Sequence, residues 1–220
     1  MKAMKKKSWW LISLLLTSSV CAKADYLLVG TTGGNRAELS IASSQFIAQS
    51  FFLNQSSKVS EIDLFMSGFG VDAFTVQLTD AIGPVATPSD VLFQTFDTFP
   101  NTGGGVSGAW VMVPANLSLK SGNYFIVLSS GQNSVTQGWL GAGSAIPTSY
   151  GTVDLMYLSN TVFGPPNAAF PPASTWIAST TGLQMSFQIV GSVPEPGSLL
   201  LLGSGILAFG ILMRRKKTRS

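Results

Sequence analysis

The chain has 220 residues, of which 45% are hydrophobic and 10% are charged, and it contains no histidine and a single cysteine. The absence of histidine excludes Ser-His-Asp and Cys-His catalysis and imidazole zinc sites. The formal net charge of +3 comes from the two ends, because the stretch from Asp25 to Val190 carries three cations against nine carboxylates, a net charge of −6. That stretch has no basic stripe to neutralise phosphates, so nucleic acid is not an expected partner.

Residues 1–24 have the parts of a secretory signal peptide. Lysines precede an apolar stretch from Trp9 to Leu16, and Ala22 and Ala24 place small residues at the two positions that a signal peptidase reads. We expect signal peptidase to cleave after Ala24. Cys21 would leave with the signal, so the mature chain would have no disulfide, metal-thiolate site or cysteine nucleophile.

Residues 25–191 are long enough to bury one sizeable core and short for two, and we expect them to form the ectodomain. Their hydrophobic pattern has the period of two that β-strands show, and nothing in it predicts a long helix. The alternation predicts half-buried strands at residues 59–66, 74–79 and 183–189. Runs that are apolar on both faces predict central strands between layers at residues 46–53, 91–96, 110–113 and 124–128.

Turn residues separate these runs, for example in Asn101–Gly105 and Ser121–Asn123. Short strands spaced roughly every ten to fifteen residues predict an all-β fold, a two-layer antiparallel β-sandwich. It should be jelly-roll-like rather than a propeller, since no repeat recurs at blade length. Residues 138–182 combine aromatic residues with glycine and proline and have weak periodicity. We expect them to be long loops over one edge of the sandwich.

A short motif follows the predicted domain, and two prolines keep its backbone extended and open to a processing enzyme. The motif residues are Val193, Pro194, Glu195 and Pro196. We place the motif at residues 193–197, at the start of a C-terminal sorting segment that comprises residues 192–220.

An uncharged run from Leu199 to Met213 comes next. As a helix it would be about 22 Å long, short of the roughly 30 Å of a bilayer core. It can span if its flanks contribute, and we place a single transmembrane helix at residues 198–213. The basic tail, residues 214–220, stays in the cytoplasm by the positive-inside rule. Its membrane-orienting cations are Arg214, Arg215, Lys216 and Lys217.

The order of Pro194-Glu195-Pro196, a short apolar span and a basic end resembles the PEP-CTERM sorting signal. The resemblance implies processing by an exosortase in a bacterium that has an outer membrane and makes exopolysaccharide. It also implies export through the inner membrane, a transient stay there, and then release or transfer to the cell surface. An ordinary single-span tail anchor is the alternative.

The ectodomain has a second resemblance, to the choice-of-anchor domains and in particular the R type. The stretches that carry it include Ala48–Phe51, Phe74–Val76, Leu119–Gly122, Tyr124–Leu128 and a late Trp176. These domains are similar secreted β modules that varied C-terminal signals attach to surfaces. The resemblance implies no catalytic residue.

Without histidine, the remaining catalytic candidate is a carboxylate pair of the kind that glycosidases use. Glu61 and Asp63 are the one close pair, and residues two apart on a strand project from one face about 7 Å apart. Such pairs are more often simply solvated, so we expect no enzyme. We also expect no cofactor or metal, because no calcium-loop or phosphate-loop pattern is present.

We therefore expect a structural or adhesive protein of the cell surface or the exopolysaccharide matrix. An alternative is a carbohydrate-binding module in which Trp139, Tyr150 or Trp176 stacks on sugar rings, although these rings could instead fill the core. Exposure separates the possibilities. A row of surface aromatics favours sugar binding, a carboxylate pair in a cleft favours hydrolysis, and neither favours a structural module.

Overall fold

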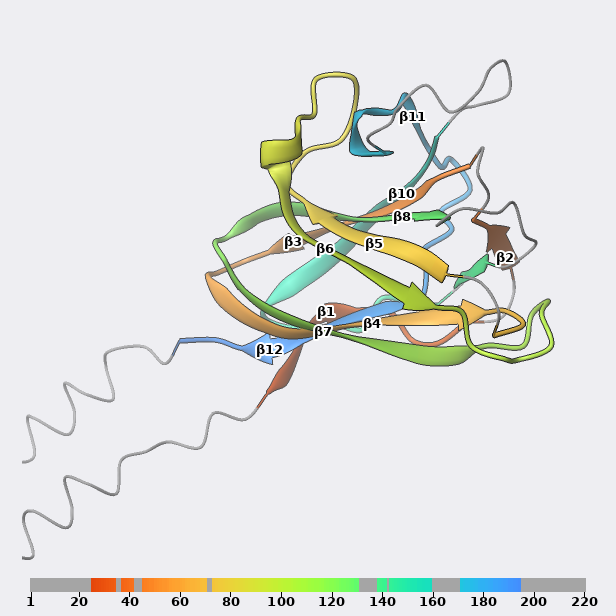
Figure 1. Cartoon of the computed structure of the whole chain (residues 1–220). Coiled ribbons are helices and arrows are strands. Elements are labelled where there is room, and N and C mark those ends of the chain that lie inside the picture. Colours follow the sequence, from red (N-terminus) through yellow and green to blue (C-terminus); the bar gives the residue numbers. More distant parts are fainter. Residues whose placement is uncertain are drawn as a thin grey trace, which may run out of the picture.

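A computed structural model describes residues 25–34, 37–41, 45–70, 73–130, 138–141, 143–159 and 171–194. Within them the chain forms two antiparallel sheets packed face to face (Figure 1). Helix in this part is limited to two 3₁₀ turns, η1 (Pro88–Asp90) and η2 (Pro171–Ala173). In the same part, no helix has the length and apolarity that a membrane crossing requires. The predicted signal peptide and the residues from Glu195 onward lie outside the described residues.

The first sheet, sheet I, is built around the long strand β4. One edge of β4 pairs with β12 and, further along, with β9, while the other edge pairs with β7. β1 extends the sheet beyond β12, and β2 extends it beyond β9. The strands of sheet I are β1 (Tyr26–Gly30), β2 (Ala37–Ser40), β4 (Ser57–Ser67), β7 (Ala109–Leu119), β9 (Gly138–Gly141) and β12 (Phe187–Ser192).

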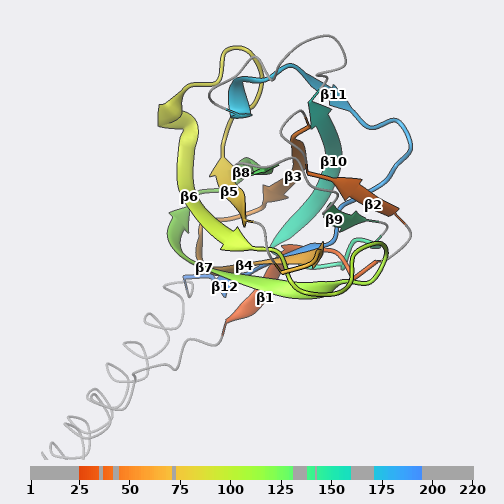
Figure 2. The same cartoon turned by 45° about the vertical axis from the view of Figure 1, so that its right-hand side comes forward.

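The second sheet, sheet II, has the order β11-β10-β3-β8-β5-β6. Its edge strand β6 comes close to β7 of sheet I, so that one side of the sandwich is nearly closed (Figure 2). The strands of sheet II are β3 (Ile47–Leu53), β5 (Ala73–Thr79), β6 (Val91–Thr98), β8 (Gly122–Ser130), β10 (Gly151–Ser159) and β11 (Trp176–Ala178).

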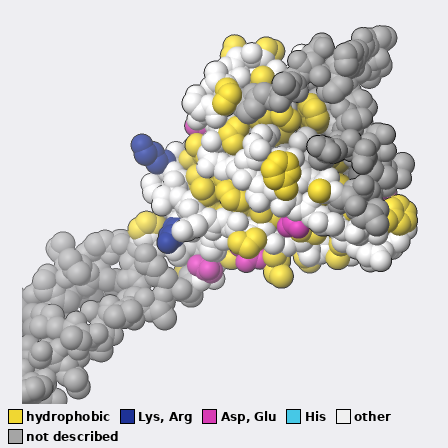
Figure 3. Space-filling model, viewed as in Figure 1, with side chains coloured by type: hydrophobic (Ala, Val, Ile, Leu, Met, Phe, Trp, Pro, Cys, Tyr) yellow, Lys and Arg dark blue, Asp and Glu magenta, His cyan; other side chains and the backbone are white. Residues whose placement is uncertain are grey.

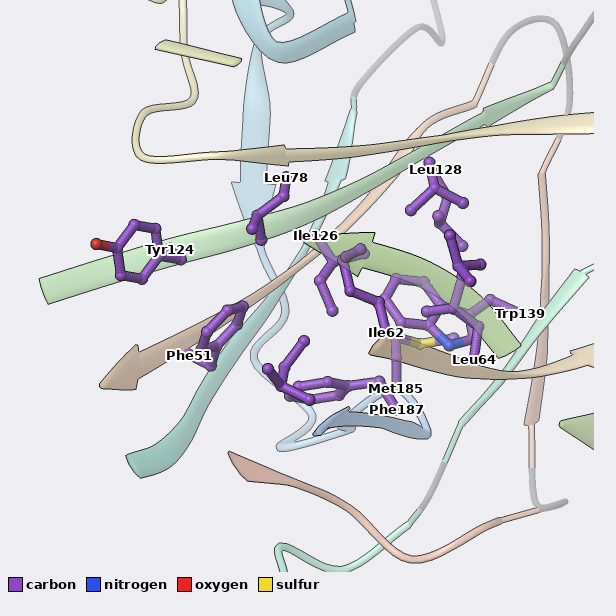
Figure 4. Packing of buried hydrophobic residues seen from close by; sticks show 14 of the residues in the cluster. Phe51, Ile62, Leu64, Leu78, Tyr124, Ile126, Leu128, Trp139, Met185 and Phe187 are labelled. Carbon is purple, nitrogen blue, oxygen red and sulfur yellow. The ribbon is translucent and has the colours of Figure 1, made fainter. Parts of the chain in front are cut away.

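The core lies between the sheets and is filled by aromatic and branched side chains (Figure 4). Phe51 of sheet II lies against Phe187 of sheet I, with ring centroids 5.9 Å apart, and against Tyr124 at 5.8 Å. Each large apolar side chain that is fully buried contributes about 1.5–3 kcal/mol to folding. This core confirms the predicted two-layer all-β sandwich.

Two of the predicted half-buried strands are present as strands, β4 and β5. In β4, Ile62, Leu64 and Met66 are fully buried and the residues between them are half-buried, as predicted. β5 covers residues 73–79, but the prediction that it is half-buried is wrong, because Thr75, Gln77 and Thr79 on its second face are buried as well. The prediction of a strand from residue 183 is wrong at its start, because β12 begins at Phe187. Met185 before it makes only an isolated bridge, to Gly141.

The prediction of four central strands is correct for two runs and wrong for two. β3 and β8 are central strands of sheet II, whereas β6 and β7 are edge strands. Phe96 of β6 is 66% exposed and Met112 of β7 is 65% exposed, so each strand has a face that nothing covers. A run that is apolar on both faces therefore predicts that a strand is present, but it does not predict whether that strand lies at the centre or at the edge of a sheet.

Residues 138–182 are not simply loops, because they contain three strands, including the nine-residue β10. β10 pairs with β3, and its register shifts between Val153 and Met156. The shift moves the inward-facing positions from one parity to the other, which hides the period of two in the sequence. This bulge explains why the sequence pattern did not predict β10.

Candidate functional site

The sorting motif begins directly at the folded domain. β12 lies between β1 and β4 and ends at Ser192, which is 6% exposed. Val193 is half-buried and packs against the hydrophobic core, and Pro194 is exposed. The first residue of the predicted motif is therefore part of the fold, and no spacer separates the last strand from the motif. Glu195, Pro196 and the basic residues lie outside the described part of the chain.

Trp139 is a core residue. It lies in β9 with no exposed surface, and its indole N–H donates a hydrogen bond to the backbone oxygen of Ser186 at 2.9 Å. A sugar ring cannot reach it. The prediction that Trp139 stacks on a carbohydrate is therefore wrong for the folded domain, because burial removes both faces of the ring from solvent.

Tyr150 and Trp176 are half-buried and lie apart from each other. Tyr150 precedes β10 and packs on Tyr26 with ring centroids 6.0 Å apart. Trp176 pairs with Ser159 at the other end of β10, and its indole N–H donates to the oxygen of Pro172 at 3.0 Å. The nine residues of β10 separate the two rings by about 30 Å at the rise of a strand. The three predicted aromatics do not form a row.

Glu61 and Asp63 lie together on the outer face of sheet I, where both are half-buried. Burial, followed by a hydrogen bond to Glu61 and the charge of Glu61, raises the pKa of Asp63 to about 7 from 3.8. Asp63 Oδ1 is buried and has no hydrogen-bond partner. Asp63 therefore tends to hold its proton near neutral pH, mainly because burial disfavours the charged carboxylate.

Apolar side chains of β4 and β7 surround this pair. Phe65 and Trp110 pack with ring centroids 5.1 Å apart, and Met112 lies directly opposite Asp63 in the β4–β7 register. Trp110 is 37% exposed. We call Glu61, Asp63, Phe65, Trp110 and Met112 the carboxylate–tryptophan face.

Sequence reasoning singled out the two carboxylates but missed Trp110, because it placed residues 110–113 in a central strand. Pro114, the next residue of β7, was the available signal, since proline within a sheet is confined to edge strands and bulges. Among the described residues, no group of three or more acidic, histidine or cysteine side chains could hold a metal ion.

The last strand of this all-β domain leads directly into the segment in which the sequence predicts a C-terminal sorting signal. Residues 192–217 match the PEP-CTERM protein-sorting motif, so the match begins at the last residue of β12. A search of curated proteins found nothing that matches the chain. The motif confirms the predicted PEP-CTERM signal and implies an extracellular protein that is exported, held at the membrane for a sorting step and processed by an exosortase.

Proposed function

We propose that this protein is a structural or adhesive component of the cell surface or the exopolysaccharide matrix. The observation that carries the proposal is the direct junction between β12 and the sorting motif. Cleavage just beyond Val193 would deliver the folded sandwich with almost no appended chain. The proposal includes signal cleavage after Ala24, a single transmembrane helix at residues 198–213, jelly-roll-like connectivity and the kinship with choice-of-anchor domains.

The proposal treats the protein as a non-enzyme. Glu61 and Asp63 project from a sheet face rather than from converging loops, and the apolar Met112 lies opposite Asp63. Glycosidases need one carboxyl on each side of a scissile bond. Glu61 and Asp63 instead project side by side from one strand, so they do not face each other across a bond.

The mass of the extracellular protein tests the sorting step. We expect the form recovered outside the cell to lack Leu199 to Ser220, because the exosortase removes the apolar segment and the basic end. Intact-mass spectrometry of extracellular protein and of the membrane fraction measures this directly. A surface form that retains those residues would support a plain membrane anchor instead.

The basic tail offers a second test of the same step. Replacing Arg214, Arg215, Lys216 and Lys217 with glutamine should impair membrane orientation and lower the amount of processed protein. Cell fractionation followed by immunoblotting measures both. Processing and location identical to those of the parent would show that these cations are dispensable.

A second candidate function, weak carbohydrate binding, is favoured by one observation: the partly exposed Trp110 lies opposite Phe65, two residues along β4 from Asp63. A tryptophan face packs on sugar C–H groups, and a carboxyl accepts hydrogen bonds from hydroxyls. Trp110→Ala should then weaken retention by the producer's own polysaccharide in affinity electrophoresis, whereas the matched variant Trp176→Ala should not. Melting temperatures of both variants control for folding, and equal retention of parent and Trp110→Ala would remove this candidate.

A further inference from the structure

One end of the sandwich differs in composition from the rest of the described surface. Lys58 and Lys120 are the only lysine or arginine residues among those that the structure describes, and both are exposed at this end. Lys58 lies opposite Ser192 in the β4–β12 register, and Lys120 directly follows the end of β7, where Leu119 pairs with Ser57. Figure 3 shows both cationic groups on the side from which β12 leaves the domain. We call this region the exit end.

Tyrosines gather at the same end. Tyr26 pairs with Gly191 at the start of β1, is 48% exposed and packs on Tyr150. The hydroxyl of Tyr124 donates to the backbone oxygen of Lys120 at 3.0 Å, which fixes the turn that carries this lysine. Tyrosine and lysine are the residues that proteins place at membrane–water interfaces, where an aromatic body lies at the headgroups and an ammonium group reaches phosphate.

The length of the tether restricts which surface can meet the bilayer. Seven residue steps separate Ser192 from Leu199, the first residue of the uncharged run, and they span at most about 25 Å when fully extended. The far end of the domain lies beyond the 11 residues of β7, about 36 Å from the exit end. An inverted sandwich would hold Ser192 further from the membrane than the tether can reach.

The acidic groups of this end lie mostly on the other sheet. Asp25 precedes Tyr26 in sheet I, whereas Asp80 and Asp90 lie at the end of sheet II, joined by a backbone hydrogen bond of 3.2 Å. The cations therefore lie beside the strand that enters the sorting motif. A domain whose net charge is −6 across residues 25–190 thus has both of its described cations at the end from which β12 leaves it.

We propose that the exit end, formed by Tyr26, Lys58, Lys120 and Tyr150, binds anionic phospholipid headgroups while the C-terminal segment still holds the chain in the membrane. This rests on the proposed function, since the tether must enter the bilayer. The contact orients β12 so that the motif leaves the sandwich toward the lipid surface. After cleavage the weak contact is lost, because it depends on the high local concentration that a short tether gives.

Fluorescence quenching tests the proposal on residues 25–220, which contain no cysteine. Ser121→Cys places a label beside Lys120, and Ser107→Cys, also exposed, places the matched control before β7 at the far end. Both proteins are reconstituted into phosphatidylglycerol vesicles that carry a headgroup quencher, and membrane insertion is checked by flotation. The label at 121 should lose fluorescence and the label at 107 should not.

Charge reversal separates lipid contact from simple tethering. Adding Lys58→Glu and Lys120→Glu to the Ser121→Cys protein, or using phosphatidylcholine alone, should abolish the quenching while flotation is unchanged. Equal quenching of the two labels, or quenching at 121 that survives both changes, would overturn the contact but leave membrane anchoring intact. Absence of flotation would overturn the anchoring step and this inference together.

Discussion

Two pairs of strands with the same sequence character have different surroundings. β3 and β8 lie inside sheet II and are buried on both faces: Phe51 and Ile126 face the core, and Ala48 and Val127 on the outer face are also fully buried. β6 and β7 are edge strands that alternate between covered and exposed residues, with Phe96 and Met112 in solvent. Apolar residues on both faces of a strand therefore do not by themselves indicate a central position.

The residues that interrupt each apolar run distinguish the edge strands from the central strands. β6 contains Gln94 and Asp97, and β7 contains Pro114, which pairs with Glu61 at a register shift. Polar groups, proline and bulges protect edge strands from pairing with other chains. In contrast, the polar residues of β3, Gln49 and Ser50, are satisfied by hydrogen bonds inside the domain. The polar residues and prolines within an apolar run therefore predict the position of a strand in its sheet better than the apolar residues around them do.

The largest effect that the comparison predicts is a difference between two phenylalanines. Phe51→Ala in β3 should lower the free energy of unfolding by about 3–5 kcal/mol, because it opens a cavity between the sheets. Phe96→Ala in β6 should change it by less than about 1 kcal/mol, because its ring is already in solvent. Urea denaturation of the ectodomain measures both. Similar losses in the two variants would mean that a partner or the chain itself covers β6.

The sequence predicted the fold class and the sorting motif, because both depend on local patterns. Alternation identified β4 and β5, and the proline motif with its apolar span identified the signal. It missed β10, because a bulge breaks the alternation, and it could not place Trp139, whose burial depends on pairing between β9 and β4. The sequence also did not predict the exit end, because only the pairing of β4 with β7 places Lys58 and Lys120 at the same end of the sandwich.

The second prediction concerns Gln49, a fully buried polar residue of β3 that holds the β10 bulge. Its amide donates to the oxygens of Asp154 and Leu155 at 3.0 and 3.2 Å, and its oxygen accepts from the N–H of Met185 at 2.9 Å. Gln49→Leu should cost about 2–4 kcal/mol, because these backbone groups would stay buried without partners. Chemical denaturation measures the loss.

Gln188→Leu is the matched control for Gln49. Gln188 lies half-buried in β12, opposite Asp63, on the outer face of sheet I. Its replacement should change stability by about 0.5 kcal/mol or less. If both variants lose the same amount, the network around Gln49 has no special role in joining the sheets.

The third prediction asks how far the outer face of sheet I, beside the edge strand β7, is shielded from water. Burial first, and then Glu61, raises the pKa of Asp63 to about 7, above its ordinary 3.8. At a pH between 3.8 and about 7, Asp63 is protonated in the folded state and ionised in the unfolded state. The free energy of unfolding therefore falls as the pH rises through this range. Asp63→Asn should be more stable than the parent at pH 8 by about 1–2 kcal/mol, after allowance for solvent screening.

The two proteins should converge as the pH falls below 3.8, where Asp63 becomes protonated in the unfolded state as well. Denaturation curves between about pH 3 and pH 8 measure the convergence. Glu61→Gln is the control: it removes the neighbouring charge and should reduce the pH dependence without abolishing it, because burial is the larger cause. A parent whose stability is flat from pH 5 to 8 would show that Asp63 is well solvated.

The smallest effect lies in the turn that leads from the edge strand β7 to the central strand β8. Tyr124, the third residue of β8, faces the core and is 7% exposed, and its hydroxyl donates a hydrogen bond across the turn to the backbone oxygen of Lys120, four residues earlier. Tyr124→Phe keeps the buried ring and removes only this hydrogen bond, so it should cost about 0.5–1.5 kcal/mol. Tyr26→Phe, in the exposed start of β1, should cost nothing measurable. Thermal melts compare the two, and amide hydrogen exchange at Ser121 and Gly122 should be faster in Tyr124→Phe alone. If exchange at Ser121 and Gly122 is unchanged in Tyr124→Phe, the turn keeps its conformation without the hydroxyl. The positions of β7 and β8 would then depend on pairing within their separate sheets and not on the turn that connects them.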